Sequence, residues 1–161
     1  MIDNDLDAAR ARSLQEQDRS LSREKAVLTS VPLLVVSFIL YNLGLAGLFG
    51  DGPNGDPWQT ELFSFRMMSG GTFSMTSGIL MIVIALLLFF VEIVKSTRTS
   101  NASVIDHLLS TFVFVAFLVE FLLVEGAAHP VFFVLMTISL IDVLAGFSVS
   151  LRAAGRDISV N

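Results

Sequence analysis

The side chains best suited to chemistry in this chain are acids and a histidine that sit inside long apolar runs. An ionised side chain within a hydrocarbon layer costs roughly 2.5–3.5 kcal/mol on insertion scales, so such groups pair with other polar groups or carry protons and ions. Some lie near the ends of their runs, from which a side chain can reach the headgroup layer, whereas Glu120 and Asp142 demand a partner or a function. The candidates for a proton or cation path are Glu120, Asp142, Asp106, His107 and Glu92.

Helical periodicity places these groups on two polar stripes, because residues about 100° apart return to the same face every three to four positions. Two interpretations are open. The stripes form a proton or cation path from Glu120 to Asp142, or the acids are neutral or paired and fix the register of the helices. The stripes are Asp106, Ser110 and Glu120 on one helix, and Ser139, Asp142, Gly146 and Ser150 on the next.

Long apolar runs must position these side chains. The chain has 161 residues, of which 53% are apolar and only 16% charged, with a mean hydropathy of +0.74. A helix needs about 20 apolar residues to cross a hydrocarbon core of about 30 Å. The sequence therefore predicts an all-α membrane protein with one four-helix transmembrane domain over residues 26–153, between a polar helical tail at 1–25 and a short tail at 154–161. The expected spans are residues 26–49, 77–95, 102–124 and 130–151.

The distribution of positive charge predicts the orientation of these spans. Nine of the ten lysine and arginine residues fall on one side of the four spans, and only Arg66 falls on the other. Cytoplasmic loops carry the excess of positive charge. We therefore expect a multi-pass protein of a bacterial inner membrane, with both terminal tails in the cytoplasm and residues 50–76 on the extracytoplasmic side.

The segment between the first two spans has a pattern of its own. Beyond Leu62, the apolar residues Phe63, Phe65 and Met67 occupy every second position, and the alternation resumes after Gly70 and Gly71. Period two on both sides of a Gly-Gly turn predicts a short extracytoplasmic β-hairpin. The alternative, in which residues 62–76 extend the second helix backwards, gives a helix of about 39 Å from Gly70 at about 1.5 Å per residue, which exceeds the hydrocarbon thickness.

Small and aromatic residues are candidates for contacts between helices or chains, because glycine lets two backbones approach closely. Asn42 and Tyr41 are polar groups within the first span, and Asn42 in particular is expected to find a partner on another helix. Leu14, Leu21 and Leu28 recur every seven residues in and after the tail, a weak pattern for self-association. The candidate interface residues are Gly44, Gly47, Trp58, Phe63, Phe65 and Gly146.

Other chemistry finds little support in the sequence. Cysteine is absent, which excludes thiolate metal sites and cysteine nucleophiles. No zinc-protease, serine-hydrolase or phosphate-loop motif is present. Glu125 and His129 are weak candidates for an outer metal site, but His129 is equally suited to cap a helix that starts at Pro130. We therefore expect no enzyme, no cofactor and no nucleic-acid partner.

Taken together, these features predict a non-catalytic integral membrane protein, surrounded by lipid, that acts as a subunit of a larger membrane complex or as a homo-oligomer. The alternative is a small proton- or cation-coupled channel or transporter that uses the intramembrane carboxylates. Proton-coupled flux through the isolated chain would distinguish the transporter from the subunit.

Overall fold

The structure is a computed structural model, and the chain divides into two compact units, Met1–Val31 and Pro32–Asn161. In the first unit the described residues 14–21 are helical. The leucine repeat reaches Leu28, which lies outside the described residues. The described residues are 10, 14–21, 32–96 and 102–157, without the side chains of 96, 102–106, 149, 150 and 152–157.

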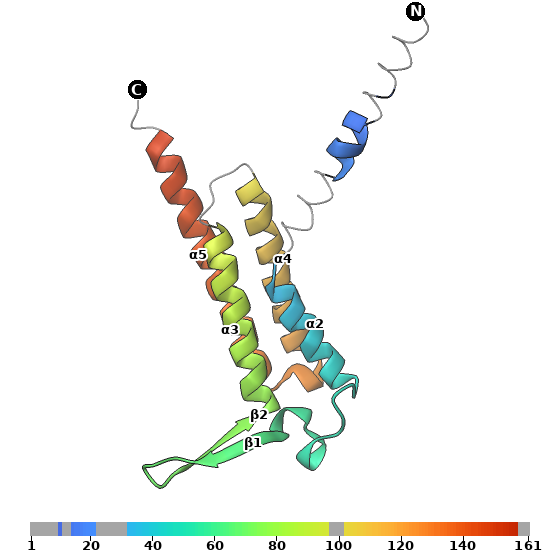
Figure 1. The fold of residues 1–161 in the computed structure, drawn as a ribbon, viewed down its shortest axis with the longest axis vertical. Coiled ribbons are helices and arrows are strands. Elements are labelled where there is room, and N and C mark those ends of the chain that lie inside the picture. The colour runs from blue at the N-terminus through green and yellow to red at the C-terminus, as the bar shows by residue number, and fades with distance from the viewer. Residues whose placement is uncertain (1–9, 11–13, 22–31, 97–101, 158–161) are drawn as a thin grey trace, which may run out of the picture. The chain divides into compact units, whose positions relative to one another are not determined.

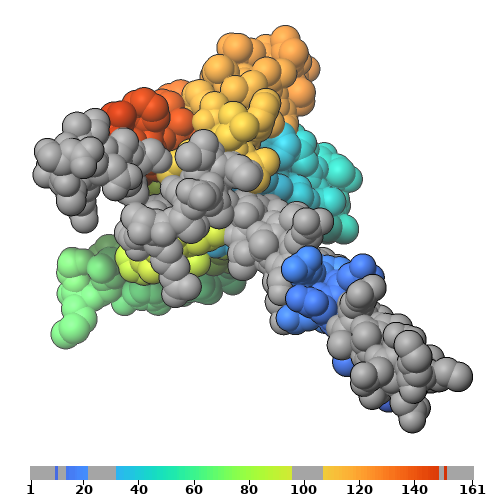
Figure 2. All heavy atoms as spheres, turned by 90° about the horizontal axis from the view of Figure 1, so that it is seen from above, coloured from blue at the N-terminus to red at the C-terminus, as the bar shows by residue number. Residues whose placement is uncertain are grey.

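Four helices form the body of the second unit (Figure 1). Helix α5 packs along both α3 and α4, and α2 packs against α3, α4 and α5. Figure 2 looks along the bundle and shows α2, in cyan, beside α4, in yellow to orange. The helices are α2 Leu34–Leu45, α3 Ser77–Ser96, α4 Ala102–Leu123 and α5 Pro130–Asp157.

Helices α3 and α4 begin and end within one residue of the predicted bounds. Helix α5 begins at the predicted Pro130 but continues to Asp157, six residues past the predicted end at residue 151, whereas α2 ends earlier than predicted. Helix α2 has 12 residues and ends at Leu45, although the predicted span continues to residue 49. Gly47 explains the end: its φ of +85° is left-handed, a conformation that glycine adopts without the penalty a Cβ imposes. The start of the predicted span, residues 26–31, lies outside the described residues.

Two helices within the described residues are long and apolar enough to cross a membrane. They are Ser77–Lys95, with a mean hydropathy of 2.8, and Pro130–Ser148, with a mean hydropathy of 2.2. The described apolar parts of the other two helices, Leu34–Leu45 and His107–Leu123, are shorter. The protein is thus mostly helical with two apolar helices of membrane-spanning length.

The predicted β-hairpin is confirmed. Strand β1, Glu61–Arg66, pairs antiparallel with β2, Thr72–Thr76, and the turn between them contains Gly70 with a φ of +86°. The Thr76 hydroxyl then accepts a hydrogen bond from the Ile79 N–H at 3.2 Å, which satisfies one of the free donors at the start of α3. Two short 3₁₀ turns, Pro53–Gly55 and Pro57–Gln59, connect α2 to β1.

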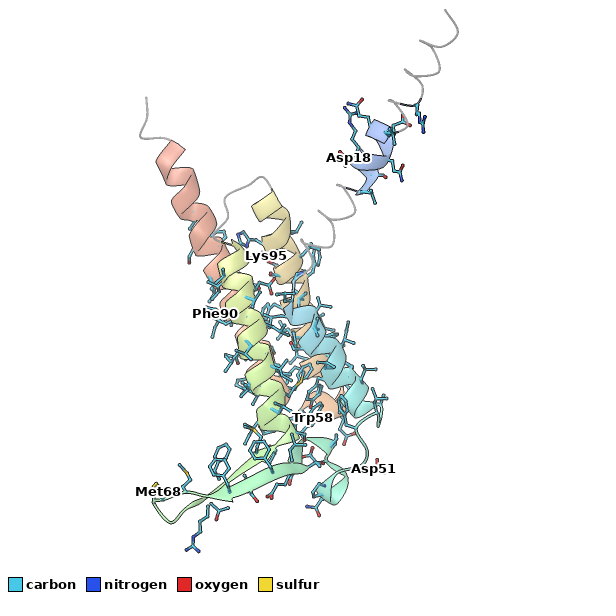
Figure 3. All side chains as sticks on the ribbon, in the orientation of Figure 1. Asp18, Asp51, Trp58, Met68, Phe90 and Lys95 are labelled. Atoms are coloured by element: carbon cyan, nitrogen blue, oxygen red, sulfur yellow. The ribbon has the colours of Figure 1, made fainter. Side chains whose placement is uncertain are left out.

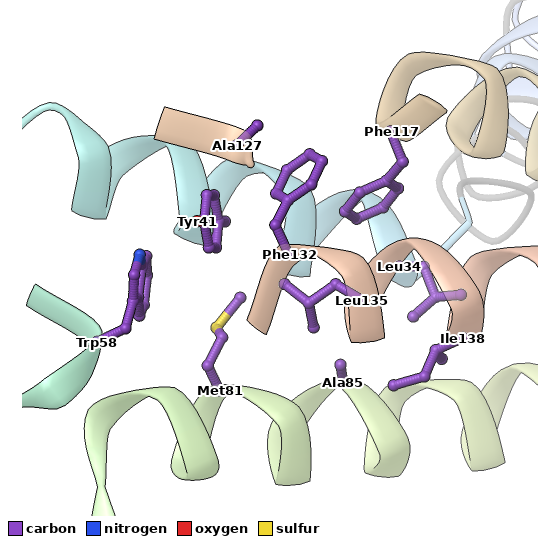
Figure 4. Packing of buried hydrophobic residues seen from close by; sticks show 10 residues of the cluster. All are labelled: Leu34, Tyr41, Trp58, Met81, Ala85, Phe117, Ala127, Phe132, Leu135 and Ile138. Carbon is purple, nitrogen blue, oxygen red and sulfur yellow. The ribbon is translucent and has the colours of Figure 1, made fainter. Parts of the chain in front are cut away.

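The core of the second unit is rich in aromatic rings (Figure 4). Phe117 and Phe132 are fully buried and their ring centroids lie 5.3 Å apart. Phe38 meets Phe117 edge to face at 4.8 Å, a geometry favoured by the ring quadrupoles. At the hairpin end, Tyr41 stacks on Trp58 at 4.5 Å. The outward faces carry exposed apolar side chains, among them Leu87 and Phe90 on α3 and Phe112 on α4.

Candidate functional site

Two groups of polar side chains lie within the helix bundle, one towards each end. The group near the start of α2, which we call the inner group, is centred on Glu92 of α3 and Asp142 of α5, each of which is only 6% exposed. The Glu92 carboxylate accepts a hydrogen bond of 3.4 Å from the Leu34 backbone N–H, one of the donors that the first turn of α2 leaves unpaired. Asp142 lies close enough to Glu92 for the two charges to interact. The acid pair therefore joins three helices.

Asp142 also faces α4. The Ser110 hydroxyl lies within hydrogen-bonding reach of its carboxylate, and His107 and Lys95 lie near it. Ser110 is itself buried. The His107 ring lies against Gly146, one turn after Asp142, in space that a Cβ at this position would occupy. Side chains from α3 and α4 thus lie near the acid on α5.

The outer group consists of Asn42 on α2 and Glu120 on α4. The Asn42 side-chain amide donates to Glu120 Oε2 at 3.0 Å and to the Phe38 carbonyl at 3.1 Å. The second carboxylate oxygen, Oε1, is buried and has no hydrogen-bond partner among the described residues. The expectation that Asn42 finds a partner on another helix is confirmed.

An apolar layer separates the two groups. Ser110 and Glu120 lie ten residues apart on α4, a rise of about 15 Å. Phe117 lies between them, and it packs with Phe38 and Phe132 across the bundle. Each of these rings comes from a different helix, so an aromatic cluster from α2, α4 and α5 lies between the inner and outer acids.

A third polar contact joins the loop between α2 and β1 (residues 46–60, called the outer loop) to the turn between α4 and α5. His129 Nε2 lies 3.1 Å from Asp56 Oδ2, while His129 Nδ1 accepts a hydrogen bond of 3.1 Å from the Val131 N–H. The histidine therefore caps α5, as the sequence allowed. Partial burial acts to raise the pKa of Asp56, but hydrogen bonds from the Trp58 N–H and the Gln59 amide, together with His129, outweigh it and hold the pKa below its usual value.

At the same end of the bundle, Trp58 stacks against Tyr41. The Tyr41 hydroxyl donates to the Gly126 carbonyl at 3.0 Å, and Trp58 is only 4% exposed. The Trp58 indole also lies against Gly44, where no Cβ could be added without moving it. Tyr41, Trp58 and Gly44 together attach the outer loop to α2.

The predicted path residues thus divide between two places. Glu92, Asp142 and His107 come together, and Glu120 stands apart from them. Asp106 lies in α4, but its side chain is outside the described part of the chain. The stripe residues Ser110, Ser139, Asp142 and Gly146 are buried, so the two stripes face inward over their described length.

The predicted interface residues have several environments. Gly44, Gly146 and Trp58 make contacts inside this chain, while Gly47 lies in open space at the end of α2. The two hairpin phenylalanines are each 52% exposed. Their role as contacts with another chain stays a prediction.

Of the weak metal candidates, Glu125 is exposed and His129 contacts Asp56. Among the described residues no three acidic or histidine side chains converge as metal ligands would. Sequence reasoning missed Asp56, although an aspartate directly before a proline is a recognisable start for a helical turn. No protein-family model, curated protein or solved structure matches the chain.

Proposed function

We propose that the chain is a non-catalytic membrane protein with four spans and cytoplasmic termini, and that it serves as a subunit of a larger membrane complex or of a homo-oligomer. Four spans are supported by the depth that α2 covers. Its start contacts Glu92 near one end of α3, and Gly44 near its end contacts Trp58, which packs against Gly78 at the other end of α3. Glu92 and Gly78 lie about 21 Å apart along α3 at 1.5 Å per residue.

The observation that carries the subunit proposal is how the intramembrane acids are used. Glu120 and Glu92 each bind a donor on α2, and Asp142 faces groups on α3 and α4. Each acid therefore links its helix to another, which is the expected behaviour of groups that fix helix register. The layer of Phe38, Phe117 and Phe132 keeps the inner and outer acids apart.

Mild extraction from the native membrane tests this proposal. We expect the chain to migrate at a mass well above its own 17.5 kDa after correction for bound detergent and lipid, with either a stoichiometric partner or further copies of itself. Crosslinking in the intact membrane before extraction provides the control for complexes that form only in detergent. A monomer in both experiments would refute the proposal.

A second candidate, a proton- or cation-coupled transporter, is favoured by two observations. Glu92 and Asp142 are neighbouring buried acids, and two like charges in one buried place favour binding of a shared proton or cation. Glu120 has a buried oxygen without a partner among the described residues.

Proteoliposomes that contain only this chain test the transporter. A pH gradient should then drive flux that Asp142→Asn abolishes while the protein stays folded. Ser148→Ala, on the same helix but exposed, is the matched control. Absence of flux from well-folded protein would refute the transporter and leave the subunit proposal intact.

A further inference from the structure

The β-hairpin has two chemically distinct faces. Cross-strand partners share a face, so the pairs Phe63 with Met75 and Phe65 with Phe73 lie together. Phe65 and Phe73 are in ring contact at 5.3 Å. The opposite face carries the polar and charged side chains Glu61, Ser64, Arg66, Thr72, Ser74 and Thr76.

A β-bulge preserves this separation. Strict alternation from Phe63 would place Glu61 on the aromatic face, but the register shifts between Glu61 and Phe63 and leaves Leu62 as the extra residue. Glu61 consequently joins the polar face, where hydrogen bonds from Ser64 and Ser74 lower the pKa of its carboxyl. The irregularity therefore keeps the only acid of β1 away from the aromatic rings.

Leu62, released by the bulge, connects the hairpin to α3. It lines an apolar groove of about 410 Å³ together with Trp58, Leu80 and Ile84. Leu80 is 39% exposed on α3, so apolar surface continues from the helix onto the start of the hairpin. Strand β2 leads directly into Ser77, the first residue of the more apolar of the two helices of membrane-spanning length.

The aromatic face of the hairpin is partly exposed and lies on the side of the hairpin where the helices are. Phe63 and Phe65 are each 52% exposed, and Met68 at the tip is fully exposed. Figure 3 shows the hairpin extending sideways from the start of α3, with ring and sulfur-bearing side chains on the side where the helices lie and a nitrogen-tipped side chain on the other. When α3 crosses a membrane, the face of the hairpin on the side of the helices faces the hydrocarbon core.

We propose that the hairpin of β1 and β2 is a lipid-binding element that lies along the outer surface of the membrane. Its aromatic face contacts acyl chains, and its polar face is in water at the level of the headgroups. This inference rests on the membrane insertion in the proposed function. Lipid is the occupant that fits because the apolar face continues the exposed face of α3, and aromatic side chains are favoured in the boundary layer. The segregated charge of Glu61 and Arg66 stays hydrated on the other face.

Site-directed spin labelling tests this arrangement, and the absence of native cysteine makes single labels straightforward. Phe65→Cys and Ser64→Cys place labels on adjacent residues of opposite faces, so they form a matched pair. Leu87→Cys, at a position 62% exposed on α3, marks the lipid. The full chain is reconstituted in vesicles of phosphatidylcholine and phosphatidylglycerol, and collisions with oxygen and with a water-soluble nickel chelate are compared.

We expect the label at residue 65 to collide preferentially with oxygen, as at residue 87, and the label at residue 64 to collide preferentially with the chelate. Met67→Cys replaces Phe65→Cys if that variant fails to fold. Chelate access on both faces would overturn the proposal, because the hairpin would then stand in water. Protection of the aromatic face from both reagents would also overturn it, because protein would cover that face. Chelate access at residue 87 would instead refute membrane insertion itself.

Discussion

Replacing Gly44 with alanine probes how the outer loop is attached to α2. A Cβ at this position would lie 2.6 Å from both Cζ2 and Cη2 of the Trp58 indole and 3.0 Å from Cδ2 of Phe49. Carbon atoms in contact prefer about 3.5–4.0 Å, so the indole must move by about 1 Å. Overpacking of this kind costs about 1–3 kcal/mol. The equilibrium constant for folding should therefore fall by about 5- to 150-fold.

The chain reports on this change itself, because Trp58 is its only tryptophan. We expect Gly44→Ala to shift the emission maximum to longer wavelength and to increase quenching by acrylamide, since the displaced indole becomes more exposed. Titration with SDS in mixed micelles measures the loss of stability. Gly71→Ala is the matched control, because a Cβ there has only one neighbour, at 3.8 Å. Unchanged emission and stability in Gly44→Ala would refute the packing of the indole against α2.

Substitutions at three polar contacts provide further tests. Tyr41→Phe removes the hydrogen bond to the Gly126 carbonyl and should cost about 0.5–1.5 kcal/mol in the same SDS titration. Asn42→Leu leaves Glu120 without its donor and should cost about 1–3 kcal/mol, whereas Glu120→Gln keeps an acceptor and should cost less. The pKa of Asp56 is lowered by folding, so its contribution is complete above its unfolded pKa of about 3.9 and disappears as pH falls through the lower folded value. Asp56→Asn should therefore reduce stability at neutral pH and flatten the acid limb of the stability profile, as measured by tryptophan emission.

Local patterns in the sequence predicted most of the helices and the hairpin. Helices α3, α4 and α5 start after strong sequence signals, namely a change of period at Ser77, a run of polar residues before Ala102 and a proline at 130. Hydropathy alone overextended α2, because an apolar side chain at Leu48 says nothing about the left-handed backbone at Gly47. A turn conformation decided the end of that helix.

The polar sites were predictable by helix face and only in part by partner. Helical periodicity predicted that Ser110 and Asp142 face inward, and both are buried. Which acids meet depends on how the helices are placed alongside one another, so pairing Asp142 with Glu92 required the three-dimensional structure. The contact between Asp56 and His129 joins residues 73 positions apart, and no local pattern encodes it.

The bulge in β1 has a consequence for how this segment tolerates insertions and deletions. Deleting one residue from a regular part of the strand would invert every side chain on one side of the deletion. Deleting Leu62 would instead restore regular alternation, with Glu61 still beside Ser64 on the polar face and opposite Thr76. The hairpin would keep both faces and lose only the leucine that lines the groove. Of the residues in β1, Leu62 is therefore the one where related chains can differ in length without turning the hairpin over.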